Sequence, residues 1–550
     1  MLSESVWNSG ELLFVIISKN IINMTMFLKS YTHVFNHTFK KRLSNMILPS
    51  TSFSQGVTND TIFALSSGFG KCGVAVVRVT GPRVLTISVD VAGFKQVPEP
   101  RKVFLRTFKD PETREDLDKG IFVYFKEPHS FTGEDCCELQ VHGGSAVVAA
   151  VLTALSRVPG CRPAEPGEFT RRAFYAGKLD LTEVEGLGDL INAETEAQRK
   201  QALLQMGGSL NDQYSSWRAS LLINLAHLEA FIDFSEEENI EDNLLSDVTT
   251  SLKNLSMSLE KHLSDGVKGE RVRSGVKTVI VGAPNVGKSS LLNVLTNDET
   301  AIVSPSPGTT RDVVKTVLDI KGYPVTLCDT AGLRTDTNDT IEIEGMSRAR
   351  THAESADLIL VIINSVDFVA WLESVQNINQ NKLVVNYLQN YLSTLGLSDI
   401  IDCSESLFDS LEKNVSRRCL IVFNKTDLLK CKNLIRNICE KHRNFISISC
   451  KTESGFSDLV KCLEVNLKYL CGSSSKENPL LSRERHRHHL MACSNSISRF
   501  LAMSREELDS QIDIGAEHIR NAATELGKIT GNISAEDVLD VVFKQFCIGK

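Results

Sequence analysis

The stretch Gly282-Ala-Pro-Asn-Val-Gly-Lys-Ser289 decides the fold of the middle of this 550-residue chain. It follows the β-branched run 279–281 and precedes a helical pattern, so it matches the GxxxxGK[ST] loop between a strand and a helix. Backbone N–H groups of such a loop point at phosphate oxygens, and the helix that begins near Lys288 adds the positive end of its dipole. The pattern predicts a phosphate-binding α/β domain, although the loop alone also fits an ordinary glycine-rich turn.

Further motifs support a nucleotide site with a bound metal ion. We expect Lys288 to reach the β- and γ-phosphates and the Ser289 hydroxyl to bind Mg²⁺. In the Asp-Thr-Ala-Gly motif that follows, Asp329 can hold the Mg²⁺ shell and the Gly332 amide can sense the γ-phosphate. Thr310 lies between the two motifs, where a switch threonine completes the Mg²⁺ shell and orders around the γ-phosphate.

The choice of base is predicted by two motifs that each follow an apolar run. In Asn424-Lys-Thr-Asp427, the Asp427 carboxylate can accept from the N1–H and the exocyclic amine of guanine, a donor pair that adenine lacks. Ser449-Cys-Lys451 can supply backbone donors to the guanine O6. We therefore predict a GTP site formed by Asn285, Gly287, Lys288, Ser289, Ser290, Thr309, Thr310, Asp329, Gly332, Asn424, Lys425, Asp427, Ser449, Cys450 and Lys451.

The residue after Asp-Thr-Ala-Gly is Leu333, where a Ras-type site has a glutamine. A leucine cannot orient an attacking water molecule. Hydrolysis then requires a different side chain, a monovalent cation or a partner protein. Asn285 in the phosphate loop offers a carbonyl-type ligand for such a cation.

Composition bounds the remaining choices. The hydrophobic content of 42% and the charged content of 23% are typical of a globular protein, and a net charge of −8 disfavours non-specific binding of nucleic acid. Fourteen cysteines occur without a CxxC pair, which indicates a reducing compartment and free thiols. No run of 18 apolar residues is present, so no membrane span is expected.

The N-terminal segment has the composition of a targeting sequence. Residues 12–59 contain no Asp or Glu but several Lys and Arg and many hydroxyl side chains, which is typical of a mitochondrial transit peptide. A disordered tail is the alternative. Glu4 and Glu11 fit a transit peptide badly, and a start at Met24 or Met26 would remove both.

The pattern of apolar residues divides the rest of the chain into blocks. Mixed strands and helices are expected at first, then helices, then strand–helix alternation as in a doubly wound parallel sheet, and finally helices again. An α/β domain thus interrupts a helical domain. The expected ranges are a leader 1–59, an α+β domain 60–180, helical parts 181–270 and 473–550, and the α/β domain 271–472 with an insertion of uncertain order at about 367–414.

Motifs outside the α/β domain carry a family resemblance. They are Ser130-Phe-Thr-Gly-Glu-Asp135, Glu138-Leu-Gln140, His142-Gly-Gly144, Pro166-Gly-Glu-Phe-Thr-Arg-Arg-Ala-Phe174, Gly177-Lys-Leu-Asp-Leu181 and Phe546-Cys-Ile-Gly-Lys550. Together they resemble the tRNA-modification GTPases of the MnmE/TrmE family, over about residues 60–550. With its leader the chain looks like a mitochondrial member.

The resemblance implies an architecture and a reaction. It implies an N-terminal folate-binding domain that dimerises, a helical domain, and an inserted Ras-like P-loop GTPase domain. The family acts with an FAD-containing partner of the MnmG type on C5 of the wobble uridine of certain tRNAs. In mitochondria the expected product is 5-taurinomethyluridine, with the one-carbon unit taken from a tetrahydrofolate derivative.

The resemblance also assigns roles to individual residues. By motif position, Arg78, Glu138, Lys178 and Lys550 match the folate contacts; cations suit the folate glutamate tail, and Glu138 suits the pterin edge. Where the family has Gly-Arg-Gly-Gly-Val, this chain has Lys71 in place of the arginine, so the charge is kept and the guanidinium fork is lost.

Hydrolysis in the family uses K⁺ as two GTPase domains meet across the nucleotides. By position, the ion would be held by Asn285, Ser304, Ser306 and Thr309. The water-organising glutamate aligns with Glu342, which would act together with Lys288 and Thr310, although the nearby Glu344 also fits.

Two features of the C-terminal part are left open. Cys547 is a candidate for a covalent role, with packing or folate positioning as the alternative. The basic run 485–489 is interpreted as a solvated helix face, with tRNA phosphate contact as the alternative. For the whole chain, the alternative to a modification enzyme is a GTPase assembly factor or a regulatory switch without modification chemistry of its own.

Overall fold

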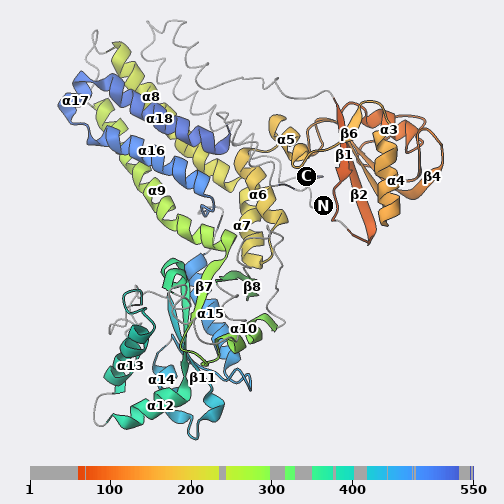
Figure 1. Ribbon diagram of the computed structural model, residues 1–550. Helices are drawn as coiled ribbons and strands as arrows, with labels where there is room; N and C mark the ends of the chain where they lie inside the picture. The colour runs from red at the N-terminus through yellow and green to blue at the C-terminus, as the bar shows by residue number, and fades with distance from the viewer. Residues whose placement is uncertain are drawn as a thin grey trace, which may run out of the picture. The chain divides into compact units, whose positions relative to one another are not determined.

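Figure 1 shows the computed structural model of the chain. It describes residues 60–68, 70–234, 243–297, 316–328, 350–375, 380–401, 418–442, 444–472, 475, 479–531, 546 and 549. Within these ranges every cysteine is free. No helix of the described residues is both long enough and apolar enough to cross a membrane. The predicted leader 1–59 lies outside the described residues.

The first part of the described chain is an α+β unit built on one six-stranded sheet. Its strands are β1 (Thr61–Leu65), β2 (Cys72–Thr80), β3 (Val103–Lys109), β4 (Asp116–Phe125), β5 (Cys136–Gly143) and β6 (Cys161–Pro163), in the order β3-β4-β5-β2-β1-β6. Only the β1–β6 pair is parallel. Its helices are α3 (Val84–Asp90), α4 (Ser145–Ser156) and α5 (Glu168–Tyr175).

Alternation along the strands explains why helices cover one face of this sheet. In β2, Val77 and Val79 are buried while Arg78 between them is only half-buried, because successive side chains point to opposite faces. Val77 and Val79 share a core with Ile87 of α3 and Leu155 of α4. Arg78 therefore lies on the opposite face.

The helical part joins two blocks that lie far apart in the sequence. Its helices are α6 (Leu181–Ile191), α7 (Glu196–Met206), α8 (Ser209–Phe234), α9 (Asn243–Ser274), α16 (Glu484–Ala502), α17 (Arg505–Ser510) and α18 (Ile512–Thr530). Leu221 of α8, Leu252 of α9, Leu490 of α16 and Ile519 of α18 are fully buried in one core. Burial of these apolar stripes holds the blocks together across the inserted α/β domain (Figure 1).

The α/β domain contains the second six-stranded sheet. Its strands are β7 (Val276–Val281), β8 (Thr316–Ile320), β9 (Tyr323–Leu327), β10 (Leu358–Asn364), β11 (Cys419–Asn424) and β12 (Phe445–Ser447), in the order β12-β11-β10-β7-β9-β8. Its helical segments are α10 (Lys288–Asn297), α12 (Ser365–Ser374), α13 (Gln380–Thr394), η2 (Thr426–Leu428), α14 (Asn433–Lys441) and α15 (Phe456–Cys471). All strand pairs are parallel except β8–β9, so the predicted Ras-like fold is confirmed.

The range 367–414, left open by the sequence, contributes to this core. Most of α12 and all of α13 fall within it. Phe368, Leu388 and Leu392 are fully buried against residues of β10 and β11, so α13 covers one face of the sheet as an integral helix. Residues 376–379 and 402–417 lie outside the described residues.

Candidate nucleotide site

The phosphate loop leaves the carboxyl end of β7, a strand whose last four residues are buried. Two glycines are required by close backbone packing. A Cβ on Gly282 would lie 2.6 Å from the Ile362 carbonyl oxygen, and Gly287 has φ +102° with a would-be Cβ 2.2 Å from the Asn424 amide nitrogen. Between them Asn285 adopts φ +59° and is exposed. The loop thus has the left-handed turns that direct successive N–H groups toward an anion.

Lys288 is the first residue of α10 and lies over the loop. Its ammonium donates to the carbonyl oxygens of Gly282 at 2.9 Å and Ala283 at 2.8 Å. Burial lowers the pKa of Lys288, but the two carbonyl contacts suit its charged form. Ser289 and Ser290 follow on the first turn of α10 and are exposed. A cation and free hydroxyls therefore stand together at a helix N-terminus, the arrangement that binds phosphate.

Asn424 joins three loops of the site. Its side chain is buried; the amide donates to the Val286 carbonyl at 2.8 Å, and its carbonyl oxygen accepts from the Cys450 N–H at 3.1 Å. The phosphate loop, the Asn-Lys-Thr-Asp motif and the Ser-Cys-Lys motif are thereby held in register. An amide suits this bridge, because its nitrogen donates to one loop while its oxygen accepts from another.

The base-recognition side is also ordered by side-chain bonds. Asp427 accepts a 2.6 Å hydrogen bond from the Ser449 hydroxyl, which lowers the pKa of Asp427. The Thr426 hydroxyl donates to the Ile448 carbonyl at 2.9 Å, and Lys425 has φ +63°. An ionised, oriented Asp427 offers only acceptors, which suits the two donors on guanine.

Tyr391 is a contributor that the sequence did not predict. It lies on α13, and its hydroxyl bonds to the Ala283 N–H of the phosphate loop at 2.8 Å. The sequence treats this range as an insertion, so no motif draws attention to the residue. The signal available was the helical spacing of Val384, Leu388 and Leu392.

Several predicted site residues lie outside the described residues. They are Ser304, Ser306, Thr309, Thr310, Asp329, Gly332, Glu342, Cys547 and Lys550. Their roles remain predictions.

Two of the predicted folate residues, Arg78 and Glu138, lie on the face of the first sheet that lacks α3 and α4. Arg78 and Glu138 are direct cross-strand neighbours, and the Arg78 guanidinium lies 3.0 Å from the Glu138 carboxylate and 5.1 Å from the Phe131 ring centroid. The stem of Lys178 lies against Gly133, since a Cβ there would be 3.5 Å from its Cε. The loop 130–135 therefore lies beside Arg78 and the aliphatic stem of Lys178.

The C-terminus approaches the same unit. The Ser66 hydroxyl at the end of β1 donates to the Gly549 carbonyl at 2.9 Å. Gly549 has φ +99°, and a Cβ there would lie 2.2 Å from the Leu65 carbonyl oxygen, so only glycine fits. Phe546 is buried with Leu181 and Val184 of α6.

The expectation that the basic run 485–489 forms a solvated helix face is wrong for its first two residues, Arg485 and His486. His486 is fully buried and lies 2.7 Å from the buried Glu185 carboxylate of α6. Arg485 also contacts Glu185, at 3.1 Å, and Arg483 contacts both Glu185 and Asp189. These five residues form the α6–α16 charge cluster. It was missed because the partner carboxylates lie about 300 positions away in the sequence.

The electrostatics of the cluster follow from burial. Burial opposes ionisation of Glu185, but its cationic neighbours outweigh this effect and hold the pKa of the carboxyl well below its usual range. Burial lowers the pKa of His486, and the Glu185 carboxylate 2.7 Å away acts in the opposite direction.

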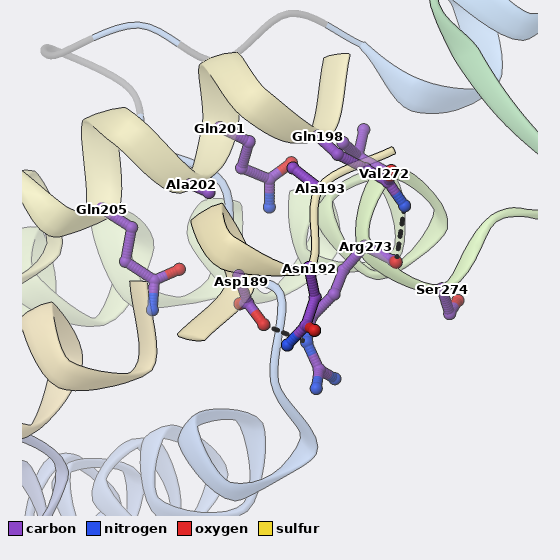
Figure 2. A pocket seen from close by; sticks show the side chains of 10 residues that line it. All are labelled: Asp189, Asn192, Ala193, Gln198, Gln201, Ala202, Gln205, Val272, Arg273 and Ser274. Atoms are coloured by element: carbon purple, nitrogen blue, oxygen red, sulfur yellow. Dashed lines mark hydrogen bonds and ion pairs between the residues drawn. The ribbon is translucent and has the colours of Figure 1, made fainter. Parts of the chain in front are cut away.

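A cavity of about 280 Å³ borders this cluster (Figure 2). It is lined by Asp189, Asn192, Ala193, Gln198, Gln201, Ala202, Gln205, Val272, Arg273 and Ser274. At its rim Asp189 accepts from Arg273 at 3.1 Å, and Gln198 donates to the Arg273 carbonyl at 3.1 Å. None of the predicted nucleotide or folate residues is among the lining residues, so the cavity is separate from both sites.

Comparison with known proteins identifies the family. A family model described as the MnmE helical domain matches residues 181–547, and one described as the GTP-binding protein TrmE N-terminus matches residues 61–178. The chain is 46% identical over 498 residues to the mitochondrial 5-taurinomethyluridine-[tRNA] synthase subunit GTPB3 of Danio rerio, covering 90% of this chain and 93% of that protein.

Two further relatives extend the comparison. Over 496 residues the chain is 43% identical to the protein of the same description from Homo sapiens, covering 89% of this chain and 93% of that one. Over 493 residues it is 43% identical to the tRNA modification GTPase MnmE of Parvibaculum lavamentivorans, covering 89% of this chain and all of that one. With these matches and the P-loop sheet described above, the chain belongs to the MnmE/TrmE family of tRNA-modification GTPases.

Proposed function

We propose that this GTPase is a subunit of a mitochondrial enzyme that converts C5 of the wobble uridine of mitochondrial tRNAs to the 5-taurinomethyl form. It would act with an FAD-containing partner of the MnmG type and use a one-carbon unit from a tetrahydrofolate derivative. The observation that carries the proposal is the Asn424 bridge, which assembles a guanine-nucleotide site on a chain similar to synthase subunits over nine-tenths of its length.

We assign the metal ions of the site from its side-chain chemistry. Ser289 presents an exposed hydroxyl at the start of α10, which suits a Mg²⁺ ligand, and Thr310 would complete the shell. Asn285, exposed at φ +59° within the phosphate loop, would hold K⁺ together with Ser304, Ser306 and Thr309. When bound, these cations neutralise charge that develops on the transferred phosphoryl group.

Catalysis in this proposal falls to three residues. Lys288 is already held over the loop by two carbonyls and would contact the phosphates. Glu342 would orient the attacking water, a role that Leu333 cannot fill, and Thr310 would close the switch over the γ-phosphate.

The face of the first sheet opposite α3 and α4 supports a folate site beside a homodimer contact. Strand pairing aligns Val103, Val123, Glu138 and Arg78 in one row across β3, β4, β5 and β2. Val103 and its neighbour Leu105 on the edge strand β3 are 63% and 64% exposed, an apolar edge that a second copy would cover. Arg78, Glu138 and Lys178, with Lys550 of the tail, would bind the charged and amidine-like ends of a folate.

The mitochondrial assignment has two supports. The leader lacks acidic residues from 12 to 59, and the relatives from Danio rerio and Homo sapiens are both described as mitochondrial.

The first test is GTP turnover by the full chain in KCl and in NaCl at equal ionic strength. Much faster turnover in KCl is expected, because K⁺ would complete the charge around the phosphates. Equal turnover in both salts would contradict the K⁺ site.

The second test measures modified uridine in mitochondrial tRNA by mass spectrometry. Cells that lack their own relative of this protein are supplied with the chain or with Lys288→Ala. The unchanged chain is expected to restore the modified uridine, and Lys288→Ala is not. Faster GTP turnover in KCl without restored 5-taurinomethyluridine would favour the assembly factor or regulatory switch.

A further inference from the structure

The carboxyl-terminal part of β10 and the first residues of the phosphate loop both bond to the hydroxyl of Tyr391. Strands β7 and β10 pair in parallel up to Val281 and Val361. One residue further, the Ile362 carbonyl accepts a 2.8 Å hydrogen bond from the Tyr391 hydroxyl, and the same hydroxyl accepts a 2.8 Å bond from the Ala283 N–H. The Tyr391 side chain therefore connects the segments that continue from β7 and β10, at the point where the backbone hydrogen bonds between these strands end.

The same peptide unit is held from its other end. The Gly282 carbonyl, which shares its peptide bond with the Ala283 N–H, accepts from the Lys288 ammonium at 2.9 Å. Tyr391 and Lys288 thus bind opposite sides of one peptide group. A Cβ on Gly282 would approach the Tyr391 hydroxyl to 3.4 Å, so the loop and the tyrosine are packed closely.

The tyrosine itself is well anchored. Its ring stacks on Tyr387, with centroids 5.9 Å apart and an interplanar angle of 10°, and Tyr387 packs against Phe368 and Trp371 of α12. Burial raises the pKa of Tyr391, so its hydroxyl keeps the proton that it donates to Ile362.

We propose that Tyr391 is a positioning residue for nucleotide binding: its hydroxyl fixes the Gly282–Ala283 peptide and, through that peptide, the Lys288 ammonium that contacts the phosphates. The proposal rests on GTP binding by this family and does not require tRNA modification. Lys288 and the phosphate loop contact the phosphates in bound GDP, in bound GTP and in the transition state alike, so loss of the Tyr391 hydroxyl should weaken the affinity for both nucleotides with little effect on kcat.

The test compares Tyr391→Phe with the matched control Tyr387→Phe in the full chain. Both changes remove one hydroxyl from the same face of α13, and the structure shows no hydrogen bond from the Tyr387 hydroxyl to any described residue. For Tyr391→Phe, we expect the Kd of a fluorescent GDP analogue and the KM for GTP to rise about tenfold, the loss of roughly one hydrogen bond with its partners left unpaired. The kcat of Tyr391→Phe is expected to stay within twofold of the unchanged protein. For Tyr387→Phe, the Kd, the KM and the kcat are all expected to stay within twofold.

Folding is controlled in the same experiment. The melting temperature without nucleotide is measured for both variants, and the dissociation rate of the fluorescent GDP is followed on loaded molecules, so any unfolded fraction does not contribute. Faster dissociation from Tyr391→Phe alone is the expected result. An unchanged GDP Kd, an equal weakening in both variants, or a fall in kcat at constant KM would each overturn the proposal.

Discussion

The nucleotide site and the α6–α16 charge cluster both contain charged side chains, but they differ in what those charges face. In the nucleotide site Lys288 and Asp427 use only part of their bonding capacity on the protein, and Ser289 and Asn285 are exposed. In the cluster, Glu185 is buried and its carboxylate faces Arg483, Arg485 and His486 of the protein itself. Charges left open to a ligand serve binding, whereas buried charges that face one another serve the joining of two distant helices.

This difference predicts that changes in the cluster affect stability and changes in the nucleotide site affect affinity. Glu185→Gln should have the largest effect. It leaves Arg483 and Arg485 without their shared carboxylate, and removing one partner of a buried pair costs about 3–5 kcal/mol. Urea denaturation measures the loss, and the Kd for GDP should be unchanged.

Glu196→Gln is the matched control on the neighbouring helix α7. Glu196 also faces two cations, Arg199 and Lys200, but all three side chains are about half exposed or more. Its denaturation midpoint should match that of the unchanged protein. Equal loss in both variants would contradict the contrast between the two environments.

The pH dependence of the Glu185 contribution has a definite sign. The pKa of Glu185 is depressed in the folded protein, so its stabilisation is present above the unfolded pKa of about 4.3 and is lost as the pH falls below it. The stability difference between the unchanged protein and Glu185→Gln should therefore narrow on acidification.

Asp427→Asn should give the largest change in affinity. An asparagine offers one acceptor and one donor where guanine requires two acceptors, so GTP binding should weaken on the order of 100-fold. Titration with GTP and with xanthosine triphosphate checks this, because xanthine carries a carbonyl in place of the amine. Unchanged selectivity between the two would show that Asp427 does not contact the base.

Asn424→Ala should affect both stability and nucleotide affinity, because Asn424 is both buried and part of the nucleotide site. Its loss leaves the Val286 carbonyl and the Cys450 N–H without this partner, at about 1–3 kcal/mol each. Stability and GDP affinity should fall together.

Asn466→Ala supplies the control for Asn424. Asn466 is equally buried, but its amide donates to Cys462 within the same helix α15. The Asn466→Ala variant should lose stability without loss of GDP affinity. A variant of Asn424 with unchanged affinity would show that the three loops do not need the bridge.

The smallest effect is expected at the N-cap of α6. Burial and the neighbouring Asp180 raise the pKa of Glu183 to about 7. A raised pKa means that the stabilising protonated form is lost as the pH rises through about 7. Glu183→Gln keeps the capping box and removes the titration, so its melting temperature should exceed that of the unchanged protein at pH 8 and approach it at pH 5. A parallel pH profile in both proteins would contradict this assignment.

Local motifs made the nucleotide site predictable. Each of the three described loops follows a short buried strand, and parallel strands bring their carboxyl ends to one edge. Sequence spacing therefore predicted that the segments at Gly282, Asn424 and Ser449 would meet, and the Asn424 bridge shows that these three loops do. Periodicity alone predicted a doubly wound parallel sheet between two blocks of helix, and the family resemblance added that the sheet is Ras-like.

What the sequence by itself determined is the set of local patterns: strand and helix periods, the glycines of the phosphate loop and the family. What only the tertiary structure decided is which distant groups face one another. The sequence predicted that Arg485 and His486 lie on a solvated helix face, because it does not show that their partner Glu185 lies beside them from 300 residues away. Tyr391 was overlooked because its contact with Ala283 exists only once α13 packs on the sheet. Both features depend on burial, which is a property of the folded chain and not of any local segment.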